Sequence, residues 1–187
     1  MNDSTANRET ATEVATLGGG CFWCIEGVYS RMRGVIAAES GYSGGHTANP
    51  TYRQICGGDT GHAEVVRITF DPAVVSYRDV LEVFFTVHDP TTPNRQGNDV
   101  GTQYRSVIFH HSPQQLAIAQ ALIAELEADK VFPAPIVTAL LPATSFYMAE
   151  VYHQLYYSSN ADQPYCQYVV APKLEKFRRK FAELAKE

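Results

Sequence analysis

Three consecutive glycines, Gly18–Gly20, stand immediately before Cys21 near the start of the chain. The β-prone run 14–17 precedes them, and apolar residues follow at helical spacing: Phe22, Ile25, Val28, Tyr29 and Met32. Because glycine accepts backbone conformations that other residues resist, the pattern predicts a strand, a tight turn and a helix. Cys21 then lies at a helix N-terminus, where a lowered thiol pKa makes a nucleophile. A buried, unreactive cysteine is the alternative.

Strands and helices alternate along the rest of the chain. We expect strands over 35–42, 63–70, 104–110 and 136–141, and helices over 76–89, 112–126, 149–157 and after Pro172. Two segments rich in Gly, Asn and Pro, 43–59 and 89–102, read as long loops, and loops of this length are usually functional. Interleaved strands and helices indicate an α/β or α+β sandwich, although the spacing leaves the strand order open.

The chain of 187 residues has the length of one domain. The polar stretch 1–13 is expected to be a disordered tail, and 14–187 a single domain. The tail lacks the apolar segment of a secretory signal, and no window approaches the ~18 apolar residues of a membrane span. We therefore expect a cytoplasmic protein, in which cysteines stay reduced.

The net charge of the chain argues against polyanionic partners. Lys and Arg number 15 and Asp and Glu 20, which gives −5 at pH 7. The chain as a whole therefore offers no electrostatic footprint for a nucleic acid or an anionic membrane surface.

Cys21 and Cys24 form a CxxC pair, which raises two alternatives. One is a thioredoxin-like dithiol. The intervening Phe22 and Trp23 suit a pocket for a small apolar group better than a disulfide offered to many proteins. The other alternative is half of a zinc site. The remaining zinc ligands would come from Cys56, His46 or His62.

Six motifs in a fixed order carry a resemblance to a known family. They are Gly20-Cys21-Phe22-Trp23, Tyr42-Ser43-Gly44-Gly45, Asn49-Pro50-Thr51-Tyr52, Gly61-His62-Ala63-Glu64, His88-Asp89-Pro90-Thr91 and Gly97-Asn98-Asp99-Val100-Gly101-Thr102-Gln103-Tyr104-Arg105-Ser106. In these motifs the chain resembles the peptide methionine sulfoxide reductases of the A class, roughly from Leu17 to Lys180. The family's late segment is matched by Phe146, Glu150, Tyr152 and His153.

The resemblance implies a fold and an activity. The fold is α+β, a two-layer α/β sandwich built as a ferredoxin-like plait with additional strands and long loops. The activity is reduction of methionine S-sulfoxide, free or in proteins, which repairs oxidised proteins. The resemblance implies a monomer with no metal or organic cofactor, and thioredoxin as the partner that supplies electrons.

The same resemblance implies roles for the residues of the reaction. Cys21 attacks the sulfoxide sulfur and becomes a sulfenic acid, and Glu64 donates the proton to the oxygen. Asp99 organises a hydrogen bond or water near the substrate. The remaining contacts come from four aromatic residues: Tyr52 and Tyr104 donate to the oxygen, and Phe22 and Trp23 enclose the methyl group.

A second thiol must remove the sulfenic acid by forming a disulfide. Cys166 is the expected resolving cysteine, in a segment that resembles the family's C-terminal recycling region, and Cys24 is the alternative. We expect Cys56 to be structural. For His153, a hydrogen-bonded structural role and a role as ligand or base both stay open.

Overall fold

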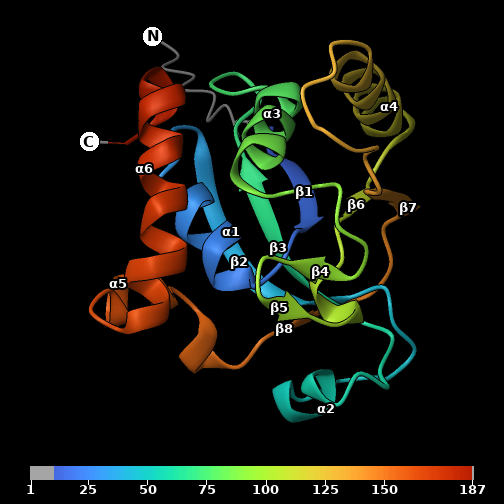
Figure 1. Ribbon diagram of the computed structural model, residues 1–187, viewed down its shortest axis with the longest axis vertical. Coiled ribbons are helices and arrows are strands. Elements are labelled where there is room, and N and C mark those ends of the chain that lie inside the picture. The colour runs from blue at the N-terminus through green and yellow to red at the C-terminus, as the bar shows by residue number, and fades with distance from the viewer. Residues whose placement is uncertain (1–10, 187) are drawn as a thin grey trace, which may run out of the picture.

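The computed structural model describes residues 11–186, which form a mixed α/β fold around a curled six-stranded sheet (Figure 1). The sheet order is β7-β6-β1-β3-β2-β8, and every pair is antiparallel except the parallel β6 and β7. The elements are β1 (Glu13–Gly18), α1 (Phe22–Tyr29), β2 (Val35–Ser43), α2 (Tyr52–Cys56), β3 (Ala63–Phe70), α3 (Tyr77–Val87), β4 (Arg95–Gln96), β5 (Asp99–Val100), β6 (Val107–His110), α4 (Pro113–Ala128), β7 (Ala139–Pro142), β8 (Phe146–Met148), α5 (Tyr156–Asn160) and α6 (Ala171–Lys180).

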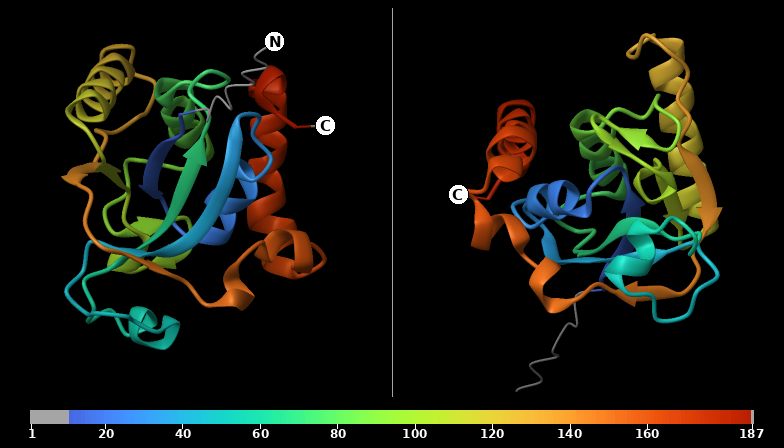
Figure 2. Two further views of the ribbon diagram at one scale, coloured as in Figure 1. Left: turned by 180° about the vertical axis from the view of Figure 1, so that it is seen from behind. Right: turned by 60° about the horizontal axis from the view of Figure 1, so that its bottom comes forward.

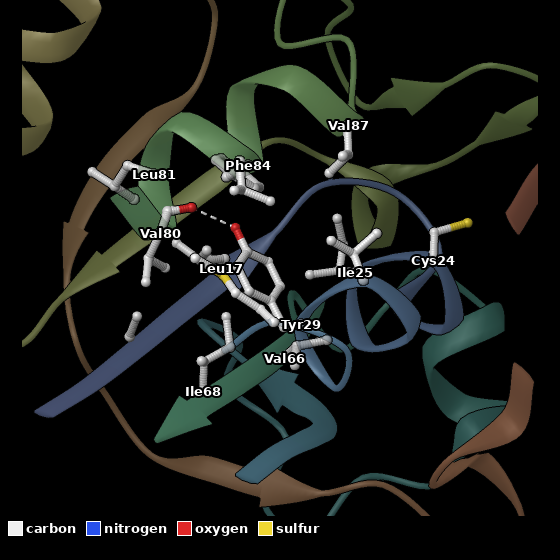
Figure 3. Close-up of a cluster of buried hydrophobic side chains, with 14 of the residues drawn as sticks. Leu17, Cys24, Ile25, Tyr29, Val66, Ile68, Val80, Leu81, Phe84 and Val87 are labelled. Carbon is white, nitrogen blue, oxygen red and sulfur yellow. Dashed lines mark hydrogen bonds between the residues drawn. The ribbon is translucent and has the colours of Figure 1, made fainter. Parts of the chain in front are cut away.

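Helices α1, α3 and α6 lie on one face of the sheet, as the view from below shows (Figure 2). The main core fills the space between this face and the helices. Figure 3 shows its centre, where side chains of α1, α3, β1 and β3 meet. Tyr29 is fully buried there, and its hydroxyl donates a 2.6 Å hydrogen bond to the carbonyl of Val80. This bond satisfies the one polar atom that the tyrosine brings into the core.

The alternation of side chains along β3 places the carboxyl group of Glu64 on the face of the sheet that the helices cover. Val66 and Ile68 belong to the main core beneath the helices, whereas Ala63 and Val65 belong to a smaller cluster with β6. Successive side chains of a strand point to opposite faces of the sheet. Glu64 therefore shares the face of Val66 and points toward α1.

Two helix starts that the sequence predicts are confirmed. Ser76 accepts a hydrogen bond from the backbone N–H of Asp79, whose side chain accepts in return, so α3 begins with a capping box. At the start of α4, the Ser112 side chain accepts a hydrogen bond from the backbone N–H of Gln115, and Pro113 occupies the first helical position. Both starts depend only on neighbouring residues.

Both segments expected to be long loops contain short helices or strands. The segment 43–59 includes the short helix α2, and the segment 89–102 includes the paired strands β4 and β5. The strand expected over 104–110 starts only at Val107, because Tyr104 belongs to a helical turn over Thr102–Tyr104. The strand expected over 136–141 is β7, which starts three residues later, at Ala139.

The prediction of one continuous helix over 149–157 is wrong. This segment holds a helical turn at Val151–His153 and then reverses at Leu155, whose φ of 52° lies in the left-handed region, before α5 begins. Strand β8, just before it, was not predicted. Residues 1–10 of the expected tail lie outside the described residues, and residue 13 already belongs to β1. Within 11–186, no helix combines the length and apolar character that crossing a membrane requires.

Candidate active site

Cys21 caps the N-terminus of α1, as the glycine pattern predicts. Gly20 makes the turn possible because its φ is 90° and a Cβ there would lie 2.6 Å from the side chain of Gln96 on β4. Burial raises the pKa of the Cys21 thiol well above its ordinary value, and the charge of Glu64 raises it further. The hydrogen bond from the Trp23 backbone lowers the pKa but does not outweigh burial. Burial thus dominates the pKa of the Cys21 thiol in this structure, and its role as nucleophile stays a prediction.

Glu64, the carboxyl group whose charge acts on this thiol, is 1% exposed. Its Oε1 accepts a 3.1 Å hydrogen bond from the backbone N–H of Phe22, the residue after the cysteine. Burial raises the pKa of Glu64 to about 8, and the charge of Asp99 adds to the shift. At neutral pH the carboxyl group therefore holds a proton beside Cys21, as a general acid must.

Two tyrosine hydroxyls face the same site from different elements. Tyr52 begins α2, and Tyr104 ends the turn before β6. Burial, together with the charge of Glu64, raises the pKa of each tyrosine above its ordinary value, so both remain hydrogen-bond donors. Cys56, the last residue of α2, is exposed. The structural role expected for Cys56 stays a prediction.

Trp23 is held on three sides by aromatic groups from the C-terminal third of the chain. Its indole N–H donates a 3.0 Å hydrogen bond to Nδ1 of His153. Tyr156 stacks on the indole with ring centroids 3.7 Å apart, and Tyr165 meets it edge-on. Phe22 also packs against the His153 ring, at 5.0 Å. His153 thus acts as a hydrogen-bond acceptor that orients Trp23, in line with the structural one of its two expected roles.

Glu150 is a residue to which the sequence analysis gave no role. Its carboxylate accepts hydrogen bonds from the hydroxyls of Tyr42 and Tyr152 and from the backbone N–H of Tyr52. Burial acts to raise the pKa of Glu150, but these hydrogen bonds bring it below its ordinary value. Glu150 therefore fixes the backbone at the start of α2, which carries Tyr52. The only sequence signal that could have pointed to Glu150 is its match to the family's late segment.

Cys166 is fully buried at the start of a π-helical turn, Cys166–Val170, that leads into α6. The preceding residue, Tyr165, joins this segment to the site. Its hydroxyl donates a 2.8 Å hydrogen bond to Asp99 and lies 3.9 Å from the sulfur of Cys24. All four cysteines are unpaired. The segment borders a cavity of about 510 Å³ lined by Cys21, Gln96, Gly97, Asn98, Asp99, Tyr165, Tyr168, Val169, Pro172 and Lys173.

The described residues do not assemble the zinc site that the sequence left open. Among residues 11–186, no three His, Cys, Asp or Glu side chains gather closely enough to hold a metal ion. Both ring nitrogens of His62 are already engaged, by the N–H of Gly45 and the carbonyl of Thr47. The CxxC pair therefore stands without further ligands.

Comparisons with known proteins show the family to which the chain belongs. The family described as peptide methionine sulfoxide reductase matches residues 13–185. The MsrA enzyme of Ralstonia nicotianae is 54% identical over 186 residues, and the match covers 97% of each chain. The MsrA enzyme of Chromobacterium violaceum is 56% identical, over 92% of this chain and 98% of its own.

The fold also resembles those of solved structures of methionine sulfoxide reductases. The crystal structure of reduced Mxr1 from Saccharomyces cerevisiae is 36% identical and superposes with a TM-score of 0.75, over 83% of this chain and 89% of its own. Mxr1 in complex with Trx2 shares the fold at a TM-score of 0.54 and 24% identity, over 83% of this chain and 92% of its own. The chain belongs to the peptide methionine sulfoxide reductase family.

Proposed function

We propose that Cys21 is the nucleophile with which this oxidoreductase reduces a methionine S-sulfoxide to methionine. The observation that carries the proposal is the buried Glu64 carboxyl group, which is bonded to the residue after Cys21 and has a pKa of about 8. A thiol attacks a sulfoxide sulfur efficiently only when the oxygen receives a proton, and a neutral carboxylic acid in a dry site supplies one.

The step balances as an oxygen transfer. The Cys21 sulfur bonds to the sulfoxide sulfur while Glu64 protonates the sulfoxide oxygen. The sulfoxide S–O bond and the sulfur–sulfur bond then break as the protonated oxygen forms a bond to the Cys21 sulfur. Cys21 becomes a sulfenic acid, and methionine leaves with its sulfur reduced by two electrons. The thiol proton restores the Glu64 carboxyl group, so the net change is thiol plus sulfoxide to sulfenic acid plus thioether.

The remaining groups orient the substrate. Tyr52 and Tyr104 donate hydrogen bonds to the oxygen, where negative charge grows before the proton arrives. Trp23 and Phe22 enclose the methyl group, and this contact selects the S epimer, whose oxygen points to Glu64. The hydrogen bond from Tyr165 holds Asp99 at the edge of the site, where it orders the polar groups around the substrate.

Recycling then depends on a second thiol. Cys166 condenses with the Cys21 sulfenic acid, releases water and forms an intramolecular disulfide, with Cys24 as the alternative. Because Cys166 is fully buried, the segment around Tyr165 must move first. The thioredoxin dithiol reduces the disulfide. This partner is supported by a yeast relative, Mxr1, whose structure was solved in complex with Trx2.

Further proposals concern the fold and setting. The four central strands form a ferredoxin-like plait, which is supported by the antiparallel order β6-β1-β3-β2 with helices after β1 and β3. Residues 14–187 act as one catalytic domain. The working form is a cytoplasmic monomer that needs no cofactor, a setting that suits its unpaired cysteines.

A single-turnover experiment tests the nucleophile. Cys24→Ser/Cys166→Ser protein is mixed with one equivalent of N-acetyl-methionine S-sulfoxide and then with dimedone, which reacts with sulfenic acids. We expect one equivalent of thioether and a dimedone adduct on Cys21. Product formation with the adduct on another residue would reject Cys21.

A further inference from the structure

Glu26 on α1 is a buried carboxylate that the reaction proposed above does not use. Its exposure is 1%, and no Lys, Arg or His nitrogen in the described part of the chain lies within ion-pair distance. Burial raises its pKa to about 7. A carboxyl group in such a place costs stability unless hydrogen-bond donors meet it. Its partners therefore show what the side chain does.

The partners of Glu26 are backbone groups at the reversal before α5. Its Oε1 accepts a 2.5 Å hydrogen bond from the N–H of Leu155, 129 residues later in the chain. Hydrogen bonding from the backbone of Tyr156 also lowers the Glu26 pKa. Leu155 has left-handed φ and ψ values of 52° and 36°, which a leucine adopts only when its surroundings hold it there. Glu26 supplies that hold.

The segment that Glu26 holds is the one that supports Trp23. Tyr156 stacks on the indole with an interplanar angle of 7°, and His153, two residues before Leu155, accepts the indole N–H. Glu26 lies three residues after Trp23 on α1, so one helix carries both the indole and the anchor of its support. The other anchor is Gln154, which bonds the backbone of Ser40 on β2.

Other charged groups near Glu26 are already engaged. The Arg31 guanidinium lowers the Glu26 pKa by its charge, but it bonds the Gly27 carbonyl and the Ser158 hydroxyl. Lys186 and Glu39 share a cavity of about 570 Å³ with Glu26. Lys186 bonds backbone carbonyls, and Glu39 pairs with Arg67. The polar contacts that distinguish Glu26 are thus those with the reversal before α5.

We infer that Glu26 is a positioning residue for substrate binding, which fixes the Leu155–Tyr156 turn and thereby holds Trp23 in the methyl pocket. The inference rests on the proposed role of Trp23 in that pocket. Removing the anchor frees the face of the indole and loosens the pocket wall, while the Cys21 and Glu64 pair stays in place. Substrate binding should therefore suffer more than the chemical step.

The test compares Glu26→Met, which refills the volume without accepting hydrogen bonds, with Glu26→Gln, which retains one acceptor oxygen. Trp23 is the only tryptophan of the chain, so intrinsic fluorescence reports its surroundings directly. In Glu26→Met we expect red-shifted emission and stronger acrylamide quenching. We also expect KM for N-acetyl-methionine S-sulfoxide to rise about tenfold, with kcat within about threefold, equivalent to ~1.4 kcal/mol of binding.

Glu26→Gln should restore the emission and bring KM to within about threefold of wild type. Glu39→Gln, in the same cavity, is the matched control and should change neither readout. A folded Glu26→Met protein with unchanged quenching and KM would overturn the inference, as would Glu26→Gln that behaves like Glu26→Met. If Glu26→Met does not fold, Glu26→Leu replaces it as the variant without an acceptor: loosened Trp23 and a tenfold higher KM support the inference, and wild-type values overturn it.

The test separates this inference from the proposed function. If wild type reduces no sulfoxide, the proposed function fails, while the quenching series still decides whether Glu26 positions Trp23. If wild type is active and quenching changes without KM, the anchor exists but does not serve substrate binding, and the inference is overturned.

Discussion

The backbone N–H of Phe22 donates a 3.1 Å hydrogen bond to Oε1 of Glu64, 42 residues later in the chain. This bond fixes the carboxyl group beside the turn that carries Cys21. It also joins α1 to β3, so the proposed nucleophile, Cys21, and its proposed acid, Glu64, belong to adjacent layers of one core. Burial raises the pKa values of both groups, and the charge of Glu64 raises that of Cys21 further.

Replacing Glu64 by Gln should separate its two effects on Cys21. The change removes the acid, so single-turnover reduction should slow by roughly 100-fold or more. It also removes a negative charge near the thiol, so the Cys21 pKa should fall. We would measure alkylation of Cys21 by iodoacetamide against pH, with peptide mapping to separate the four cysteines. A raised thiol pKa together with full activity would contradict the assignment of Glu64 as the acid.

The two tyrosine hydroxyls should contribute separately to the same step. Tyr52→Phe and Tyr104→Phe should each lower kcat about tenfold to 100-fold, because each removes a donor to the developing negative charge. Tyr147→Phe serves as the control, since Tyr147 lies on β8 and packs on His62. Rates close to wild type in both single variants and in the double variant would show that the hydroxyls do not touch the oxygen.

The two candidate resolving cysteines give opposite outcomes. Cys166→Ser should perform one stoichiometric reduction and then stop with thioredoxin, because no disulfide forms for thioredoxin to reduce. Cys24→Ser should turn over with thioredoxin at nearly the wild-type rate. The measurement counts equivalents of product with thioredoxin, thioredoxin reductase and NADPH. Multiple turnover by Cys166→Ser would remove Cys166 from recycling.

Cys24→Ser also tests the alternative reading of the CxxC pair. If the CxxC pair were instead a general dithiol, Cys24→Ser would abolish protein disulfide reduction, and wild type would reduce insulin disulfides at a rate typical of such enzymes. We expect wild type to show no such insulin activity. The bulky Phe22 and Trp23 between the cysteines are the reason.

The two buried carboxyl groups should make stability depend on pH. Their folded pKa values, about 7 for Glu26 and about 8 for Glu64, lie above the ordinary value of 4.5. The native state then binds more protons than the unfolded state, so the unfolding free energy falls as pH rises from about 4.5 through these values. His88 has the opposite sign, because burial lowers its pKa to about 4, and it adds stability as pH rises toward 6.5.

A difference measurement isolates one of these groups. The unfolding free energy of Glu26→Gln minus that of wild type should increase by about 2 kcal/mol between pH 5 and pH 8, because only wild type must ionise a buried carboxyl group. Urea unfolding at both pH values provides the numbers. A difference that stays constant with pH would mean that Glu26 titrates normally.

Local signals explain which parts of the fold the sequence predicts. The Ser76 and Asp79 pair and the Ser112 and Pro113 pair place two helix starts correctly, since a cap involves only adjacent residues. The expected helix over 149–157 failed because a distant carboxylate, Glu26, holds the chain reversed at Leu155. A pattern of apolar spacing contains no information about a partner 129 residues away.

The sequence indicates the residues of the candidate site but not the contacts that support them. The glycine turn predicts the placement of Cys21, and the family motifs indicate Glu64, Tyr52 and Tyr104. The supports of these residues come from contacts between distant segments. Glu150 beneath Tyr52 and Tyr165 against Asp99 follow no local pattern, so only the structure assigns their partners.

The most direct test of the account is a chromatographic assay of methionine formed from separated S and R sulfoxide epimers, with dithiothreitol as reductant. Wild type and Cys21→Ser are compared at equal concentration, with circular dichroism to confirm that both are folded. We expect wild type to reduce the S epimer alone and Cys21→Ser to reduce neither. Reduction of neither epimer by folded wild type, or of the S epimer by Cys21→Ser, would contradict it.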